Sequence, residues 1–294
     1  MRYVFRGALA CALVTLVALS AAAGPAAKFA RLSRDSGGAP LALQTAVVTY
    51  APADGDLDYT VDLIGAVHVA DQSYYAELNE RFTGYDAVLF EMVTREDKPP
   101  VTSASGDGKA PGGGDLSFIS VMQNGMKDML GLAFQLDEID YGAANLVHAD
   151  LSTRGLRESM KARDESLYVY FWRMVFASFD QYATDPLGAR DWQLAAALLT
   201  NSQDENALKI VVAEELLASM QSGDMFGGED GSAIIAARNE HAIGVLREQI
   251  DAGTHRIGIF YGVAHMPDFE QRLEAMGLVR TRTEWLDAWR LASP

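Results

Sequence analysis

The sequence predicts an α/β fold with a mixed central sheet flanked by helices, and three features lead to this prediction. Short apolar runs rich in β-branched residues alternate with segments of helical spacing along the 294 residues. Hydrophobic residues make up 49% of the chain, which is enough to bury a large core. An order of apolar strand, Gly-x-x-His, helix and strand occurs near both ends, which suggests a duplicated β-α-β core with a helical insert between the halves.

The first 23 residues have the pattern of a secretory signal peptide. Arg2 and Arg6 give a positive start, Gly7 to Leu19 is an uncharged apolar run, and three alanines ending at Ala23 offer small side chains for cleavage. Because the apolar run is shorter than the ~20 residues that a membrane span needs, we expect cleavage and export to the periplasm or the medium. The chain would be held at a membrane only if this segment stayed uncleaved.

The net charge of −16 limits the partners of the chain. Such a surface repels phosphate backbones and anionic lipids, so we expect no nucleic-acid partner. A peptide, a small molecule, a cationic ligand or a metal ion remains compatible with it. The only cysteine, Cys11, lies in the leader, so the mature chain would have no disulfide, no thiol nucleophile and no thiolate metal ligand.

The N-terminal part of the expected domain, which covers residues 41–294, contains three strands and a helix. Leu41 to Tyr50 and Tyr59 to His68 are β-branched runs separated by a turn-like segment, and we expect them to form a hairpin. Ser73 to Phe82 has helical spacing, with Ser73 as the expected N-cap. Tyr85 to Met92 is a short apolar run typical of a strand buried on both faces.

The middle of the chain is expected to be mostly helical. Residues 94–115 are rich in Pro, Gly, Ser and charge, which predicts a flexible surface loop. Leu116 to Gln135 and most of Leu151 to Met220 have helical patterns, and Gly223 to Gly231 is a second glycine-rich loop. This region forms the expected insert.

The C-terminal part is expected to repeat the plan of the first. Ser232 to Ile250 is a predicted helix, and Arg256 to Met266 is a predicted buried strand. Pro267 to Met276 follows as a helix with proline in its first turn, and Leu278 to Trp285 as a last strand.

Three side chains with strong ligand and acid-base chemistry follow these strands. His68, Glu91 and His265 each lie at the C-terminal end of an expected strand, where open α/β sheets bind their ligands. If the strands are parallel neighbours, two imidazoles and a carboxylate converge and could hold Zn²⁺, Mn²⁺, Co²⁺ or Fe²⁺ with positions left for water and substrate. A histidine at a strand end is also often only a hydrogen-bonded structural residue. Glu91 is the stronger candidate, because a carboxylate after so apolar a run is costly unless it is paired or binds a metal.

Two further segments carry polar candidates. Arg238 and Asn239 lie inside the expected helix before the last Gly-x-x-His strand, where they could orient a carboxylate or stabilise an oxyanion, or could belong to a solvated helix face. For His148 and Asp150 we favour a capping role, in which Asp150 or Ser152 starts the next helix.

Together these motifs resemble the TraB, PrgY, GumN and TIKI family, which belongs to a wider superfamily with erythromycin esterase and ChaN. The resemblance runs from about Leu41 to the C-terminus and implies an α/β fold with a duplicated core. It implies a site at the histidines, the glutamate and the Arg/Asn pair. TIKI members are metal-dependent proteases, the erythromycin esterase branch is metal-independent, and ChaN is linked to haem, so the resemblance supports the site more than the reaction. The residues that carry it are Gly65, His68, Glu91, Arg238, Asn239, Gly262, His265 and the segment from Asp140 to Asp150.

Three functions follow as hypotheses. The first is a metal-dependent hydrolase of peptide or amide bonds, with His68 and His265 as ligands of Mn, Co or Zn and Glu91 as a ligand or general base. Arg238 and Asn239 would position the substrate. The second is a metal-independent, esterase-like hydrolase in which a histidine is the general base and Glu91 orients it. The third is a non-enzymatic module that binds a metal, haem or a peptide.

Overall fold

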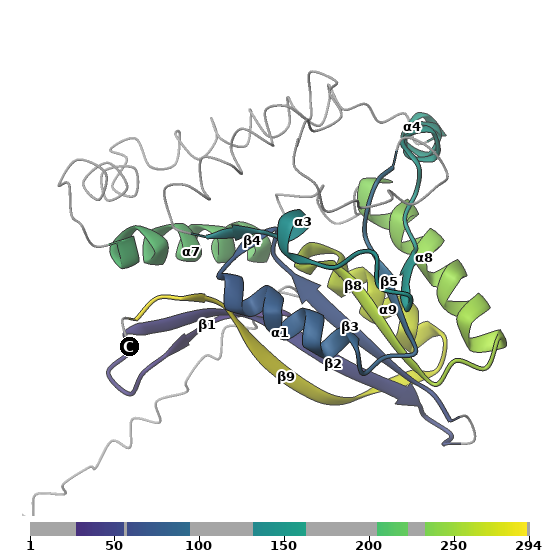
Figure 1. The fold of residues 1–294 in the computed structure, drawn as a ribbon, viewed down its shortest axis with the longest axis horizontal. Coiled ribbons are helices and arrows are strands. Elements are labelled where there is room, and N and C mark those ends of the chain that lie inside the picture. The colour runs from purple at the N-terminus through teal and green to yellow at the C-terminus, as the bar shows by residue number, and fades with distance from the viewer. Residues whose placement is uncertain (1–27, 56–57, 95–131, 163–204, 223–232, 293–294) are drawn as a thin grey trace, which may run out of the picture.

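The computed structural model describes residues 28–55, 58–94, 132–162, 205–222 and 233–292 (Figure 1). The expected leader over residues 1–23, nearly all of the expected loop over 94–115, the glycine-rich loop over 223–231 and part of the helical insert lie outside these residues. Within the described residues, no helix is both long and apolar enough to cross a membrane.

A mixed seven-stranded sheet forms the centre of the described structure. Across the sheet the order is β9-β2-β3-β8-β5-β7. One edge of β2 pairs with β9, and the other edge pairs with β1 in its first half and with β3 in its second half. The strands are β1 (Ala30–Arg34), β2 (Pro40–Pro52), β3 (Thr60–Ala66), β5 (Ala87–Phe90), β7 (Leu146–His148), β8 (Arg256–Gly262) and β9 (Leu278–Arg290).

The directions of the strands explain why the sheet is mixed. β3, β8, β5 and β7 are parallel to one another, and β3 and β5 are buried along nearly their whole length, as their apolar runs predict. β2 pairs with β3 as an antiparallel hairpin, and β9 pairs with the other edge of β2, also antiparallel. The predicted fold class, a mixed α/β sheet flanked by helices, is therefore confirmed.

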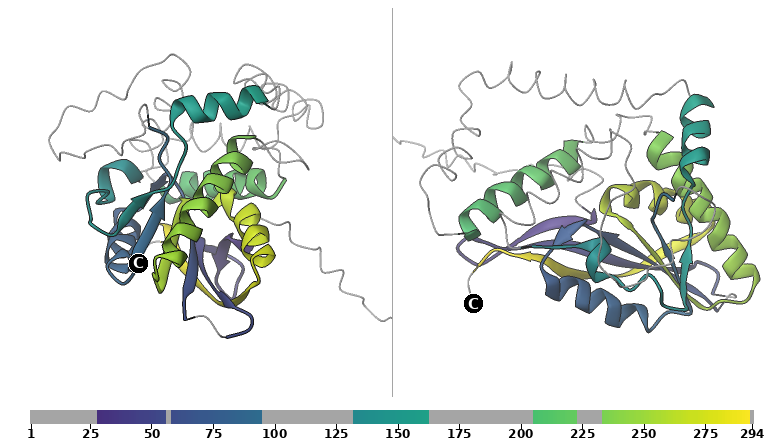
Figure 2. Two further views of the ribbon diagram at one scale, coloured as in Figure 1. Left: turned by 90° about the vertical axis from the view of Figure 1, so that its right-hand side faces the viewer. Right: turned by 45° about the horizontal axis from the view of Figure 1, so that its top comes forward.

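Helices cover both faces of the sheet (Figure 2). Neighbouring residues of a strand point to opposite faces, and on β8 the ring of Phe260 contacts Phe82 of α1, whereas the ring of Tyr261 contacts Phe269 of α9. α1 and α9 therefore lie on opposite faces. The described helices are α1 (Gln72–Phe82), α3 (Gln135–Glu138), α4 (Thr153–Ala162), α7 (Glu205–Ser222), α8 (Ala233–Asp251) and α9 (Met266–Ala275).

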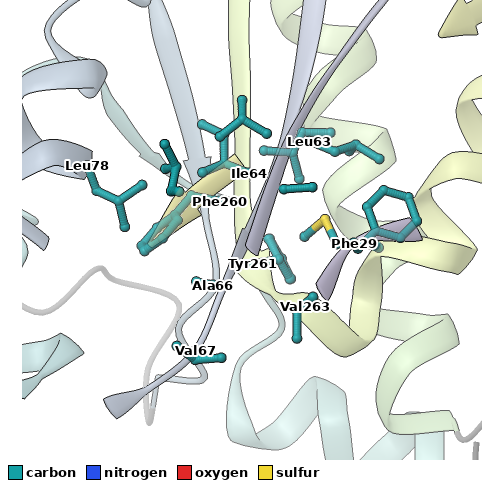
Figure 3. Close-up of a cluster of buried hydrophobic side chains, with 14 of the residues drawn as sticks. Phe29, Leu63, Ile64, Ala66, Val67, Leu78, Phe260, Tyr261 and Val263 are labelled. Carbon is teal, nitrogen blue, oxygen red and sulfur yellow. The ribbon is translucent and has the colours of Figure 1, made fainter. Parts of the chain in front are cut away.

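The hydrophobic core continues through both layers. Figure 3 shows Leu78 of α1 near Ile64 and Phe260 on one side of the sheet, and Phe29 and Tyr261 on the other. All five side chains are at most 1% exposed. The first and last strands contribute Ala30 and Trp289 to the same core. The indole N–H of Trp289 in β9 also donates to the backbone oxygen of Val69 (2.7 Å), one residue after His68.

Several predicted boundaries are wrong. α1 begins at Gln72 after Asp71, so Ser73 is not its N-cap. The strand predicted to reach Met266 ends at Gly262, because a 3₁₀ turn over Val263–His265 leads directly into α9. The last strand continues beyond Trp285 to Arg290, because β2 offers it a partner along its full length.

The end of the predicted helix over Leu116 to Gln135 is also wrong. Ala133–Phe134 forms a two-residue strand, β6, which pairs antiparallel with β4 (Val69–Ala70), and a helix, α3, begins only at Gln135. The backbone groups of this segment find partners beside His68 instead of within a helix. Residues 116–131 lie outside the described part of the chain.

The expected duplication is not settled by the strand pairing. β3, β5, β8 and β9 all run in the same direction, so both Gly-x-x-His units consist of a strand, a helix and a second strand of the same sense. However, only β8 lies between β3 and β5, whereas both β3 and β2 lie between β8 and β9. The two units share a local plan, and the duplication stays a prediction.

Candidate active site

Three parallel neighbouring strands bring the predicted residues to one edge of the sheet. The order β3-β8-β5 places the C-terminal ends of these strands side by side. Glu91 directly follows β5, His68 is two residues beyond β3, and His265 ends the 3₁₀ turn after β8. The condition under which the three side chains converge, that their strands are parallel neighbours, is therefore met.

The three side chains surround Gly262. The Gly262 N–H donates to Glu91 Oε2 (2.7 Å), and His265 Nε2 lies 3.7 Å from Glu91 Oε1. A Cβ added to Gly262 would lie 3.3 Å from Glu91 Oε2 and 3.9 Å from His68 Nε2. The missing side chain at this position therefore lets the carboxylate approach the strand end, between the two imidazoles.

Arg238 of α8 links Glu91 to a second carboxylate. Its Nη2 donates to Glu91 Oε1 (2.7 Å), and its Nε donates to Asp150 Oδ1 (2.8 Å). Nη2 also donates to Asp150 Oδ2 (2.5 Å), so the contact with Asp150 is bidentate. The Asp150 side chain is 0% exposed, and Arg238 is its counter-ion.

This cluster keeps Glu91 ionised. Burial alone would raise the pKa of the Glu91 carboxyl, but the charge of Arg238, the two histidines and the Gly262 N–H together hold that pKa well below its usual range. Burial alone would also lower the pKa of Arg238, and the two carboxylates raise it above its ordinary value. The site therefore contains a fixed anion beside two imidazoles.

Asn239 fixes the hydrogen of His265. Its Nδ2 donates to the backbone oxygen of His265 (3.1 Å) and to Asp268 Oδ2 (2.8 Å), and Oδ1 lies 2.6 Å from His265 Nδ1. Both acceptors of Nδ2 lack hydrogens, so the amide has one orientation and its oxygen must face Nδ1. Because an amide oxygen only accepts, Nδ1 carries the hydrogen and the Nε2 lone pair faces Glu91.

His265 is neutral at ordinary pH. Burial disfavours its charged form and lowers its pKa to about 4, although the charge of Glu91 acts in the opposite direction. The side chain of His68, by contrast, is exposed at the surface. The Nδ1 atom of His68 lies 3.1 Å from Gln135 Oε1, and Gln135 Nε2 donates to the hydroxyl of Tyr141 (2.9 Å).

The structure shows the partners of the two polar residues of α8. Asn239 is 0% exposed and its polar atoms contact His265 and Asp268, so it orients a histidine, and a role in positioning the substrate stays a prediction. One of the expected roles of Arg238 was to orient a carboxylate, and in the structure it binds the carboxylate of Glu91. His148 Nε2 bonds the backbone oxygen of Met92 (2.7 Å), which is a structural contact.

The sequence analysis favoured a capping role for Asp150 and did not single out Gln135, although both contact residues of the site. The helix cap that was expected from Asp150 or Ser152 is Ser152, whose Oγ accepts from the Gly155 N–H (3.2 Å), whereas Asp150 binds Arg238. A signal existed for Asp150, since it follows the strand β7, and the rule that selected the three other strand ends applies there too. No sequence pattern pointed to Gln135.

The donor set suits a metal ion by type but not by arrangement. Two neutral imidazoles and a carboxylate are suitable ligands for Zn²⁺, Mn²⁺ or Co²⁺. Across the described ranges, however, no group of three His, Cys, Asp or Glu side chains is arranged to hold a metal ion. The guanidinium of Arg238 lies against Glu91 Oε1, where it would repel a cation. As they are arranged, His68, His265 and Glu91 do not fit a metal ion, and coordination by them stays a prediction.

The buried His265 predicts that the protein is less stable in acid. Its pKa in the folded protein, about 4, is below the ordinary value of 6.5, so the unfolded chain binds the proton more strongly. The stabilising contribution is complete above pH 6.5 and falls by about 3 kcal/mol as the pH drops to 4. Urea unfolding between pH 7.5 and 4.5 measures this, and the dependence should be weaker in His265→Gln. Parallel curves for the two proteins would contradict it.

The two Gly-x-x-His glycines are expected to tolerate alanine differently. At Gly262 a Cβ meets Glu91 Oε2 at 3.3 Å, and that carboxylate is pinned by Arg238, so Gly262→Ala should destabilise the protein by about 1–3 kcal/mol. At Gly65 the nearest atom is Val263 Cγ2 at 3.4 Å, an ordinary contact, so Gly65→Ala should cost less than about 1 kcal/mol. Urea unfolding of both variants tests this, and equal losses would refute it.

In comparisons with protein-family models, curated proteins and solved structures, nothing matches this chain. The resemblance to the TraB, PrgY, GumN and TIKI family therefore rests on the motif residues alone.

Proposed function

We propose that this chain is a hydrolase that cleaves an ester, amide or peptide bond, with His68 as general base and Glu91 as the anion that supports it. One observation carries the proposal. In both His68 and His265, Nδ1 lies against the oxygen of a side-chain amide, and Nε2 faces the region of the ionised, buried carboxylate of Glu91. Such pairs of titratable groups in contrasting environments are typical of acid-base sites.

The two histidines have different roles in this mechanism because their surroundings differ. His68 is exposed and can reach a substrate and its attacking water. Nε2 of His68 would take a proton from that water while the oxygen attacks the carbonyl carbon, and the proton would then pass to the leaving group. Glu91 stabilises the imidazolium that forms in between, because it stays ionised beside Arg238. Neutral His265 can accept a hydrogen bond from the water through Nε2.

A metal-dependent hydrolase is the second candidate, and one observation favours it. Metal-binding histidines usually have their other ring nitrogen held by a hydrogen bond, as both are here. The Arg238 and Gly262 donors on the two oxygens of Glu91 argue against it, so the metal-free mechanism is the better supported of the two. A net charge of −16 favours neutral or basic peptides and small molecules as substrates of either enzyme. The signal-like N-terminus supports action outside the cytoplasm.

The test is an activity screen joined to a metal analysis. The protein is purified without chelator, its metal content is measured by elemental mass spectrometry, and hydrolysis is assayed with p-nitrophenyl esters and neutral or basic peptide anilides. Hydrolysis that survives EDTA and phenanthroline supports the metal-free mechanism. Hydrolysis that chelators abolish and Mn²⁺, Co²⁺ or Zn²⁺ restores supports the second candidate. A protein that binds a peptide, haem or a metal and hydrolyses none of these substrates would overturn the proposal in favour of a binding module.

A further inference from the structure

We propose that Gln135 is a positioning residue that holds the hydrogen of His68 on Nδ1, as Asn239 does for His265, so that the His68 Nε2 lone pair faces the site. The consequence for catalysis rests on the proposed function. The effect on the histidine itself does not, and it can be measured separately.

Gln135 contacts His68 through both its backbone and its side chain. The Gln135 N–H donates to the backbone oxygen of His68 (2.9 Å), and Gln135 Oε1 lies 3.1 Å from His68 Nδ1. Gln135 is only 5% exposed, although the histidine beside it is at the surface. A buried amide has fewer alternative hydrogen-bond partners than an amide in water, so it keeps its orientation. That orientation determines which nitrogen of the His68 ring carries the hydrogen.

The small sheet of β4 and β6 explains why the two residues meet. Val69 pairs with Phe134 and Ala70 with Ala133 in an antiparallel register. Continued by one residue, that register places His68 opposite Gln135, and the backbone hydrogen bond between them is the next rung of the ladder. The ladder therefore sets Gln135 directly across from His68.

The orientation of the Gln135 amide gives the direction of the hydrogen bonds. Gln135 Nε2 donates to the hydroxyl oxygen of Tyr141 (2.9 Å), a buried residue whose ring packs on Phe90, and in this orientation Oε1 faces His68. Because Oε1 can only accept, His68 Nδ1 must donate and Nε2 must be free of hydrogen when the ring is neutral. If the amide were reversed, its NH₂ would face Nδ1 and the hydrogen would be on Nε2.

The two amides perform the same task from different parts of the fold. Asn239 comes from α8 and Gln135 from the start of α3, yet each presents an oxygen to the Nδ1 of one histidine. An imidazole without such a partner favours hydrogen on Nε2, the nitrogen that a general base needs unprotonated. Without the Gln135 oxygen, most molecules should therefore carry the hydrogen on Nε2. His68 would stay in place but could not act as the general base in those molecules.

The test measures the tautomer directly. Full-length protein with ¹⁵N-labelled histidine is studied by long-range ¹H–¹⁵N NMR at pH 8, and the His68 signals are assigned with His68→Gln. In the unaltered protein we expect hydrogen on Nδ1. Gln135→Leu should shift most of it to Nε2, and Gln135→Glu, which keeps an acceptor, should leave it on Nδ1. Leu136→Ala, an exposed neighbour in α3, is the matched control and should change nothing.

Kinetics give the second readout. On a substrate that the unaltered protein hydrolyses, Gln135→Leu should lower kcat by about 10–100-fold with little change in KM, and Gln135→Glu should restore most of it. Thermal unfolding of each variant checks that the fold is intact. Hydrogen on Nε2 in the unaltered protein, or an unchanged tautomer in Gln135→Leu, would overturn the role of Gln135. The expected tautomer shift in a protein that hydrolyses nothing would support this role and overturn the proposed function instead.

Discussion

Replacing His68 with alanine is expected to lower kcat by about 10²–10⁴-fold and to leave the fold intact. The exposed side chain makes one side-chain hydrogen bond within the described residues, to Gln135, so its removal should cost less than about 1 kcal/mol of stability. The general base, by contrast, is lost completely. The measurement is kcat and KM on the best substrate of the screen, with thermal unfolding beside it.

A matched control makes this result specific. His241 is an exposed histidine on α8, and His241→Ala should retain the activity and stability of the unaltered protein. If His68→Ala kept its full activity, His68 could not be the base and the buried His265 would have to be considered instead. If both variants lost activity equally, the loss would reflect a general disturbance of the protein.

Replacing Arg238 with methionine should produce the largest loss of stability, about 3–5 kcal/mol. The change removes the counter-ion of two carboxylates, and the side chains of Asp150 and Glu91 are only 0% and 13% exposed. Both would remain buried, near one another and without the cation that now binds them. Urea unfolding at pH 7.5 measures the loss.

Two further variants show whether the carboxylates cause this loss. Arg247→Met alters an exposed arginine on the same helix and should stay within about 0.5 kcal/mol of the unaltered protein. Adding Asp150→Asn to Arg238→Met removes one of the orphaned charges and should recover part of the loss. A loss below about 1 kcal/mol in Arg238→Met, or no recovery in the double variant, would mean that the cluster is not a tightly coupled unit.

The main parts of the site could be predicted because they obey a rule about strand ends. Buried parallel strands are recognisable as short apolar runs, and whatever follows them lies at one edge of the sheet, so the sequence alone points to His68 and Glu91. The rule also covers Asp150, but capping offered a simpler explanation for an aspartate two residues before a serine. In that case a local signal hid a distant contact, with Arg238 88 positions away.

Other features leave too little trace in the sequence. β4 and β6 have two residues each, which is too short for any alternation to appear, so the segment around Phe134 was assigned to a helix. The role of Gln135 depends on that pairing and was missed with it. The polar character of Arg238 and Asn239 is visible in the sequence, but their partners follow β5 and β7 or lie in α9, and they meet only in the folded chain.

The central position of β8 also determines when the sheet can form during folding. Thr60 in β3 and Ala87 in β5 have no strand between them until Arg256 and Ile257 arrive from the far end of the chain. Contacts between such distant segments slow folding, and strands that wait for a partner keep open edges that attract other chains. A chain shortened before Arg256 should therefore aggregate rather than fold, and the active site can assemble only after synthesis has passed His265.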